Sequence, residues 1–238
     1  MIKKPFFILL LATVLMWSCS STSNKYDDKA IEHLDKLSET IGQLNSCSYT
    51  LNTISITANE VVFSNENDVY MRGPNKMHIS IKGTKGSKGF WYDGSSFAYY
   101  SYDKQIFDTI AGADNIIAVI DQLHNEYGID FPASDFFYPS FTDDVIDNFN
   151  EVLFYGDSDN NGVKCVVIKA VNSEKELQLW IDKETNLPHM MLITKLDNSG
   201  DSYEAVFSNW RINPNLPDML FEFEPPSNST RVKLTPKN

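Results

Sequence analysis

Alternation of apolar and polar residues dominates the chain after its first 45 positions. In residues 77–82 and 176–182 every second side chain is apolar, which is the period of a β-strand with one buried face. Turn-forming pairs such as Asp93-Gly94 and Asn161-Gly162 separate short runs of this kind. The pattern predicts about ten strands in an antiparallel sheet.

The first strand changes phase along its length. Tyr49 and Leu51 share one phase, whereas Ile54 and Ile56 share the other. A β-bulge inserts one residue into a strand in this way and bends it. We therefore predict a bulge at residues 52–53 and curvature in this part of the sheet.

Three segments have a helical period instead. In residues 30–44 leucines and isoleucines recur every three or four positions, which is typical of an amphipathic helix. A second helix is predicted from Asp114, a candidate N-cap, to Gly128, a suitable stop. A third is expected from Thr142, because acidic residues follow in its first turn. The order helix, strands, helical insert, strands indicates an α+β fold.

Residues 1–18 have the pattern of a bacterial lipoprotein signal. Two lysines precede an apolar run over residues 6–17, and Ser18-Cys19 follows it. The run is too short to span a bilayer comfortably. Cys19 is therefore the predicted lipidation site, although bulky Trp17 departs from the usual motif and leaves an ordinary secretory signal as the alternative.

These boundaries divide the chain into three parts. Residues 1–18 are the predicted signal peptide, 19–28 a polar and flexible tether, and 29–238 one folded domain, with two small domains as the alternative. Lipidation predicts an anchored protein in the cell envelope of a Gram-negative-type bacterium, at the outer membrane and facing the periplasm.

Charge restricts the partners of the chain. Its net charge is −12, and removal of residues 1–18 takes away two lysines and no acid, which moves the net charge to −14. Such a surface repels nucleic acid and anionic headgroups, so nucleic-acid binding is excluded and lipid recognition is expected to depend on apolar burial.

Two cysteines remain beside Cys19. Cys47 and Cys165 are the only pair that could form a disulfide in an oxidising compartment, but Cys165 lies in an apolar run where a buried thiol is as reasonable. The sequence leaves both states open.

Motifs for catalysis and metal binding are weak. Residues 157–162 match the first half of a calcium loop, but Ile168 stands where the loop needs Glu, so an acidic hairpin turn is the better interpretation. Residues 83–89 are rich in glycine and lysine without the spacing of a phosphate-binding loop. The four histidines are scattered, and His78 falls on the polar face of its strand. We predict no enzyme, no metal and no cofactor, with a hydrolase of dispersed site as an alternative.

Several longer runs carry a family resemblance. Residues 89–107 hold an aromatic strand, an Asp-Gly turn and a tyrosine-rich return strand, and this segment resembles a hairpin of the LolA and LolB lipoprotein-carrier superfamily. Residues 127–137, 178–188 and 208–226 resemble predicted periplasmic proteins grouped as domain of unknown function 2092. The similarity extends over nearly the whole chain after residue 28.

The resemblance implies a strongly curved antiparallel sheet, a half-barrel whose concave face is covered by helices around an apolar cavity. Carriers of this superfamily shield acyl chains there. We therefore predict a non-enzymatic protein that binds a lipid, an acyl chain or another apolar ligand; the alternative is an interaction or envelope-sensing module, with an envelope protein as partner and the same residues as filled core. The predicted cavity residues are Phe90, Tyr92, Phe97, Tyr99, Ile117, Ile120, Leu123, Phe136 and Phe137.

Overall fold

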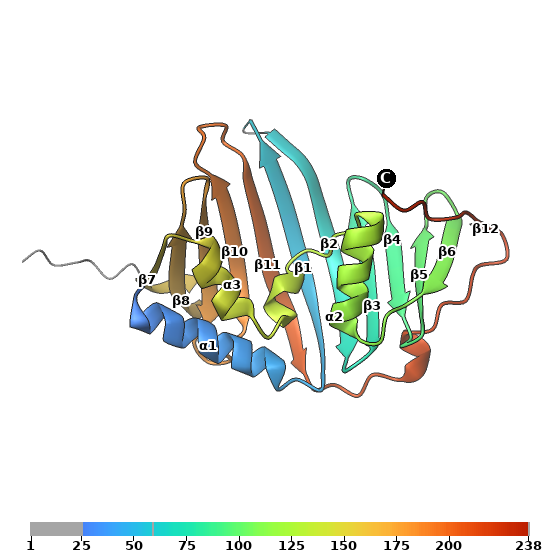
Figure 1. Cartoon of the computed structure of the whole chain (residues 1–238), viewed down its shortest axis with the longest axis horizontal. Coiled ribbons are helices and arrows are strands. Elements are labelled where there is room, and N and C mark those ends of the chain that lie inside the picture. Colours follow the sequence, from blue (N-terminus) through green and yellow to red (C-terminus); the bar gives the residue numbers. More distant parts are fainter. Residues whose placement is uncertain (1–25, 59, 238) are drawn as a thin grey trace, which may run out of the picture.

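One large, curved and open sheet organises the protein (Figure 1). The computed structural model describes residues 26–58 and 60–237. The predicted signal peptide, Cys19 and most of the predicted tether lie outside the described residues. In the described part the sheet has twelve strands, two more than predicted. They are β1 (Ser46–Thr57), β2 (Glu60–Arg72), β3 (Lys76–Gly83), β4 (Lys88–Tyr92), β5 (Ser96–Ser101), β6 (Ile106–Ala111), β7 (Glu151–Asn160), β8 (Val163–Val171), β9 (Lys175–Asp182), β10 (Pro188–Lys195), β11 (Ser202–Ile212) and β12 (Thr230–Arg231).

Two antiparallel meanders meet at the middle of this sheet. The strand order is β12-β6-β5-β4-β3-β2-β1-β11-β10-β9-β8-β7, so β1 through β6 run to one edge and β7 through β11 return from the other edge to pair with β1. Of the strands that the structure describes, β12 alone pairs in parallel, beside β6. The α+β class and the mostly antiparallel sheet are confirmed.

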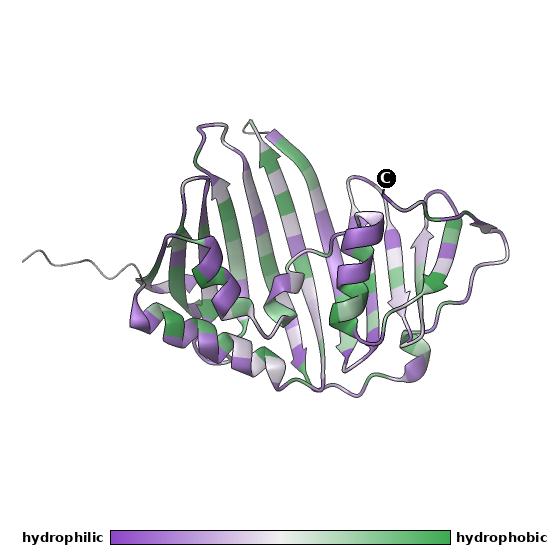
Figure 2. Ribbon diagram, viewed as in Figure 1, coloured by the Kyte–Doolittle hydropathy of each residue, from purple (hydrophilic) through white to green (hydrophobic). Residues whose placement is uncertain are grey.

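Side chains alternate between the two faces of the sheet. Figure 2 shows this as alternating apolar and polar bands along most strands. Register places Leu51 opposite both Asn67 and Phe207, so these three side chains share one face. The helices lie against that face (Figure 1), which we call the inner face. The other face is called the outer face.

The first helix is close to its predicted position. Helix α1 (Asp28–Gly42) buries Leu34, Leu37 and Ile41, and the side chain of Asp27 accepts a hydrogen bond of 2.9 Å from the backbone N–H of Lys29. The acceptor satisfies one of the free donors of the first turn. Contact with the sheet begins before the helix, because Tyr26 forms a bridge with Val152 of β7.

The helical insert between β6 and β7 crosses from one half of the sheet to the other. Helix α2 (Ile116–Gln122) is capped by Asn115 and not by the predicted Asp114, because the Asn115 side chain accepts from the backbone N–H of Ala118. A π-helical turn continues it to Gly128, whose φ of +67° ends the helix as predicted. A 3-10 helix (Ser134–Phe137) and α3 (Phe141–Asn148) follow, and α3 begins one residue before the predicted Thr142.

The predicted bulge at residues 52–53 of β1 is wrong. Thr53 is 1 % exposed and continues the inner phase of Tyr49 and Leu51, while Ile54 and Ile56 point to the outer face. The extra residues lie instead on the neighbours of β1, opposite Ser48–Thr50 in β11 and opposite Ser55–Ile56 in β2. A buried threonine in the apolar phase explains the error, because a polar residue there looks like a phase change.

The chain after β11 covers part of the outer face. A 3-10 helix (Asp218–Leu220) precedes Phe221, which is fully buried, and Phe223, whose ring lies 4.9 Å from that of Trp91. The ring of His78 lies 4.8 Å from Trp91 on its other side. His78 is therefore half-buried, although its strand pattern places it on a polar face.

This position of His78 predicts a pH-dependent stability. Burial lowers the pKa of His78 from 6.5 to about 4 and outweighs the opposing effects of Asp68 and of the Leu220 backbone. Below pH 6.5 the unfolded chain takes up a proton that the folded chain refuses, so stability falls as the pH drops from 6.5 towards 4. We expect a loss of about 2 kcal/mol, reduced for partial exposure of the ring.

Urea unfolding of the wild type and of His78→Phe at neutral pH and at pH 4.5 measures this contribution. The wild type should lose more stability than the variant on acidification, because other groups titrate equally in both. Equal losses in the two proteins would show that His78 is not desolvated.

The two remaining cysteines are free and buried. Burial raises the pKa of Cys47 to about 12 and that of Cys165 to about 11, which keeps both thiols protonated at neutral pH. Of the two states that the sequence leaves open, the structure has the buried thiols.

Candidate functional site

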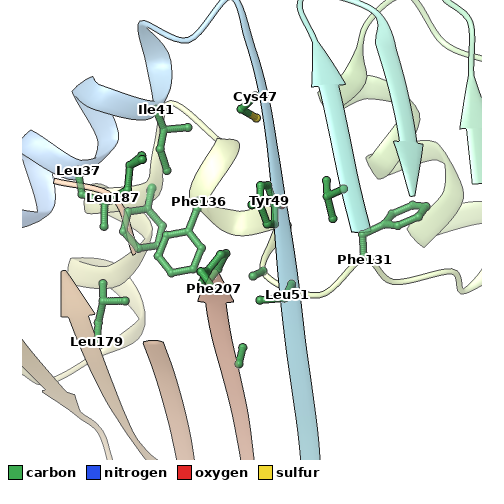
Figure 3. Close-up of a cluster of buried hydrophobic side chains, with 14 of the residues drawn as sticks. Leu37, Ile41, Cys47, Tyr49, Leu51, Phe131, Phe136, Leu179, Leu187 and Phe207 are labelled. Atoms are coloured by element: carbon green, nitrogen blue, oxygen red, sulfur yellow. The ribbon is translucent and has the colours of Figure 1, made fainter. Parts of the chain in front are cut away.

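The two halves of the inner face are filled differently. Under β7–β11 and β1, the 3-10 helix Ser134–Phe137 places Phe136 in the core. The Phe136 ring lies 5.6 Å from that of Phe207 and 4.8 Å from that of Phe141. Phe137 stacks on Tyr49 at 6.1 Å. Figure 3 shows Phe136 and Phe207 on one side of β1, together with Leu37 and Ile41 of α1. In this half the packed core leaves two smaller pockets, one of about 350 Å³ between α1 and Phe137 and one of about 290 Å³ beside Phe136 and α3.

A larger hollow lies on the other side of β1. This inner-face pocket has a volume of about 640 Å³, within the roughly 300–1,000 Å³ typical of small-molecule sites. Strands β2 to β5 form its floor, and residues 128–132 and the C-terminal segment form its walls. Its apolar lining includes Phe63, Ile81, Phe90, Tyr99, Phe131 and Leu234.

The wall over residues 128–132 depends on the end of the helical insert. The left-handed conformation of Gly128 turns the chain back, and the backbone N–H of Ile129 donates to Leu123 at 3.1 Å. Phe131 then packs edge-on against Phe90 at 5.2 Å and separates the pocket from the packed core. Figure 3 shows Phe131 on the side of β1 away from Phe136.

The C-terminal segment continues this wall, and the backbone N–H of Lys237 donates to the Glu126 carbonyl at 2.6 Å. Buried Asp108 of β6 accepts hydrogen bonds from Arg231 Nε at 2.9 Å and from the backbone N–H of Leu234 at 2.8 Å. Burial opposes ionisation of Asp108, but these donors outweigh it and hold its pKa below the usual range. The carboxylate thereby fixes Leu234 at the pocket.

The floor of the pocket contains buried polar atoms. Asn67 is 1 % exposed; its side-chain nitrogen donates to the Leu51 carbonyl at 2.8 Å, but its Oδ1 has no hydrogen-bond partner among the described residues. Tyr203 lines the same floor, and its hydroxyl is buried near that of Thr53. Burial raises the pKa of Tyr203 to about 12, so the phenol is neutral.

Two lysines lie at the edge of the pocket, at the β3–β4 turn. Lys88 is half-buried in the inner phase of β4, and Lys85 is exposed with its Nζ 4.6 Å from the Phe63 ring centre. The backbone N–H of Ser87 donates to Asp103 at 2.7 Å, so this amide is already engaged. The glycine-rich run therefore forms a strand connection, as predicted, and places two cations beside the pocket.

The predicted cavity residues fall into three groups. Phe90 and Tyr99 line the inner-face pocket. Phe136 and Phe137 belong to the packed half, where both border the pocket beside α1 and Phe136 also borders the pocket beside α3. The others lie at or beneath α2, where all except half-buried Ile117 are fully buried: Tyr92, Phe97, Ile117, Ile120 and Leu123. The hydroxyl of Tyr92 donates to the Ala113 carbonyl.

Sequence reasoning missed most of the pocket. The side chains of β2 that point to the inner face are Phe63, Asn65, Asn67 and Val69. Two successive asparagines among inward-facing apolar residues are a usable signal that this part of the sheet lines a pocket and not a packed core. The contribution of Leu234 carries no such signal, because it depends on a contact with Asp108, more than 120 positions away.

The motifs that could have indicated other chemistry have structural roles. Residues 157–162 form the β7–β8 turn, where Lys183 pairs with Asp157 and Lys164 pairs with Asp159, each at 2.7 Å. Among the described residues no three His, Cys, Asp or Glu side chains are grouped to hold a metal ion. No described helix has the length and apolarity needed to cross a bilayer.

Comparison with known proteins supports the fold. Residues 30–235 match the model of a family described as "Predicted periplasmic protein (DUF2092)". No curated protein matches the chain by sequence.

Three solved structures illustrate the structural likeness. An uncharacterised conserved protein from Thermus thermophilus has 11 % identity and a TM-score of 0.51 over 86 % of this chain and 98 % of its own. The lipoprotein LppX from Mycobacterium tuberculosis has 11 % identity and a TM-score of 0.50 over 80 % of this chain and 100 % of its own. A LolA superfamily protein from Nitrosomonas europaea has 10 % identity and a TM-score of 0.39, over 82 % and 97 %. At these identities the likeness concerns the fold alone.

Proposed function

The chain belongs to the family of predicted periplasmic proteins DUF2092, as its sequence resemblance indicated, and we propose that it is a lipid-anchored, non-enzymatic binding protein of the cell envelope. Its ligand is a lipid, an acyl chain or another molecule with a long apolar part, held in the inner-face pocket. In this proposal the inner face is the concave face of a half-barrel, with the helices as its cover.

One observation carries the proposal. The inner-face pocket, at about 640 Å³, is larger than either pocket of the packed half, and aromatic and aliphatic side chains form most of its lining. Removing apolar surface from water gains about 2.5 kcal/mol for each 100 Å² buried, so a hydrocarbon chain gains substantially by entering such a pocket. Predicted cavity residues Phe90 and Tyr99 contribute to this lining.

The anchoring part of the proposal comes from the sequence. Residues 1–18 are proposed as the signal peptide, Cys19 as the lipidated residue, the residues after it as the tether, and the remainder as one binding domain. This arrangement would place the pocket next to the membrane that supplies or receives an apolar ligand, at the outer membrane and facing the periplasm.

A substitution that fills the pocket tests ligand binding. Ile81 and Lys82 are neighbours in β3, but Ile81 lines the pocket while Lys82 points to the outer face and is 67 % exposed. We expect Ile81→Trp to lose a bound apolar molecule that the wild type and the matched control Lys82→Trp retain. Native mass spectrometry after gentle purification measures the bound mass.

Two results would count against the binding proposal. One is a wild type that carries no apolar molecule and takes none up from added lipid. The other is an Ile81→Trp variant that is folded and still retains the same mass as the control.

A second candidate is an interaction or envelope-sensing module that binds another envelope protein. It is favoured by the packed half of the inner face, where Phe136 and Phe207 pack together and leave two pockets that are smaller than the inner-face pocket. An absence of bound lipid, together with a stable protein complex recovered from envelope extracts, would favour this function.

A further inference from the structure

Lys88 occupies an unusual position for a lysine. It belongs to the inner phase of β4, where it pairs across the sheet with Ile81 of β3 and with buried Ser101 of β5. The residue is half-buried and lines the inner-face pocket. In the described part of the chain no carboxylate lies within ion-pair distance of its ammonium group. Lysines are rarely drawn towards the interior without a partner of opposite charge.

The carboxylates around the pocket are engaged elsewhere. Asp108 is bound by Arg231 and by the backbone of Leu234. Asp130 pairs with His124 at 2.5 Å, and Asp103 accepts the backbone N–H of Ser87. Each acid that could neutralise Lys88 from a neighbouring segment therefore has another donor.

A second polar group faces the same space. Register aligns Asn67, Ile81 and Lys88 in one row across β2, β3 and β4. Two strand spacings separate Asn67 from Lys88, which is about 10 Å between their Cα atoms. The free Oδ1 of Asn67 and the ammonium group of Lys88 thus flank apolar Ile81. A pure hydrocarbon would leave the ammonium group of Lys88 without a partner, whereas Oδ1 of Asn67 is an acceptor and needs a donor such as a hydroxyl group.

We propose that the inner-face pocket binds an acidic amphiphile, whose single carboxylate or phosphate group pairs with Lys88 while its hydrocarbon part lies against Phe90 and Phe131. This inference rests on the proposed function and names the ligand class of the same pocket. Lys85, at the turn beside it, adds a second cation at the edge of the pocket. The charge of the protein as a whole opposes such a ligand, so the preference must arise locally from these two lysines.

A series of three ligands separates the contribution of the acidic group to affinity from that of the hydrocarbon part. Hexadecanoic acid, hexadecyl phosphate and methyl hexadecanoate have similar hydrocarbon parts, but only the ester is uncharged. Displacement of Nile red from the full chain should be stronger for at least one acid than for the ester by about tenfold, the value of one charge-assisted hydrogen bond.

The variant Lys88→Met keeps the length and apolar stem of the side chain and removes its charge. We expect it to bind the preferred acid and the ester equally. The control Lys82→Met, on the outer face of β3, should keep the wild-type preference. Thermal unfolding of both variants verifies that they are folded.

The outcomes distinguish this inference from the function on which it rests. Equal displacement by acids and ester in the wild type, or a preference that survives in Lys88→Met, overturns the role of Lys88 and leaves the binding function intact. A wild type from which none of the three displaces the probe overturns both.

Discussion

Replacement of Cys19 by alanine should move the protein from the membrane fraction to the soluble fraction. Each buried methylene of a covalent lipid contributes about 0.8 kcal/mol to membrane binding, so several acyl chains hold a protein almost irreversibly. Cell fractionation followed by immunoblotting measures the distribution.

Ser20→Ala is the matched control, because it changes the next residue and leaves the thiol in place. It should remain membrane-bound and incorporate radiolabelled palmitate, while Cys19→Ala should do neither. A Cys19→Ala protein that stays in the membrane fraction would refute lipidation as the anchor.

Replacement of Phe207 by alanine should destabilise the domain by about 3–5 kcal/mol, the usual cost of removing a buried phenylalanine. Phe207 is 2 % exposed and lies at the centre of the packed half. Its ring contacts Tyr49 at 5.6 Å, Phe136 at 5.6 Å and Trp210 at 5.8 Å. Three different segments therefore lose contacts together, and the cavity left behind cannot close easily.

Urea unfolding monitored by tryptophan fluorescence measures this loss. Ser208→Ala, one residue further along β11 and on its other face, should change the free energy of unfolding by less than about 0.5 kcal/mol. A loss of under 1.5 kcal/mol for Phe207→Ala would mean that the 3-10 helix holding Phe136 is not part of the cooperative core.

Most elements could be predicted from the sequence because their signals are local. The period of leucines and isoleucines in α1 and the alternation in β3 and β9 record which face of each segment is buried. Turn residues then separated the strands. Where a cap depends on one side chain, as at Asn115, neighbouring candidates could not be distinguished, because Asp114 has the same chemistry.

Features made by distant segments could not be predicted. The bulges of β2 and β11 are defined by register against β1, and one strand alone carries no register. Burial of His78 depends on the segment after β11, which reaches its strand from 140 positions away. The face of β3 that the local pattern marks as polar is therefore covered by another segment at His78.

The amino-acid sequence by itself determined the acidic charge, the family and the alternating pattern that makes a sheet, and it predicted the envelope signal. Only the tertiary structure decided where the hollow lies. Phe97 and Phe90 have the same chemistry in the sequence, but Phe97 is fully buried beneath α2 and Phe90 borders the inner-face pocket. The physical reason is that a side chain packed in the core and a side chain lining a cavity occupy the same apolar positions of a strand. Which of the two a residue becomes depends on how distant segments pack against it.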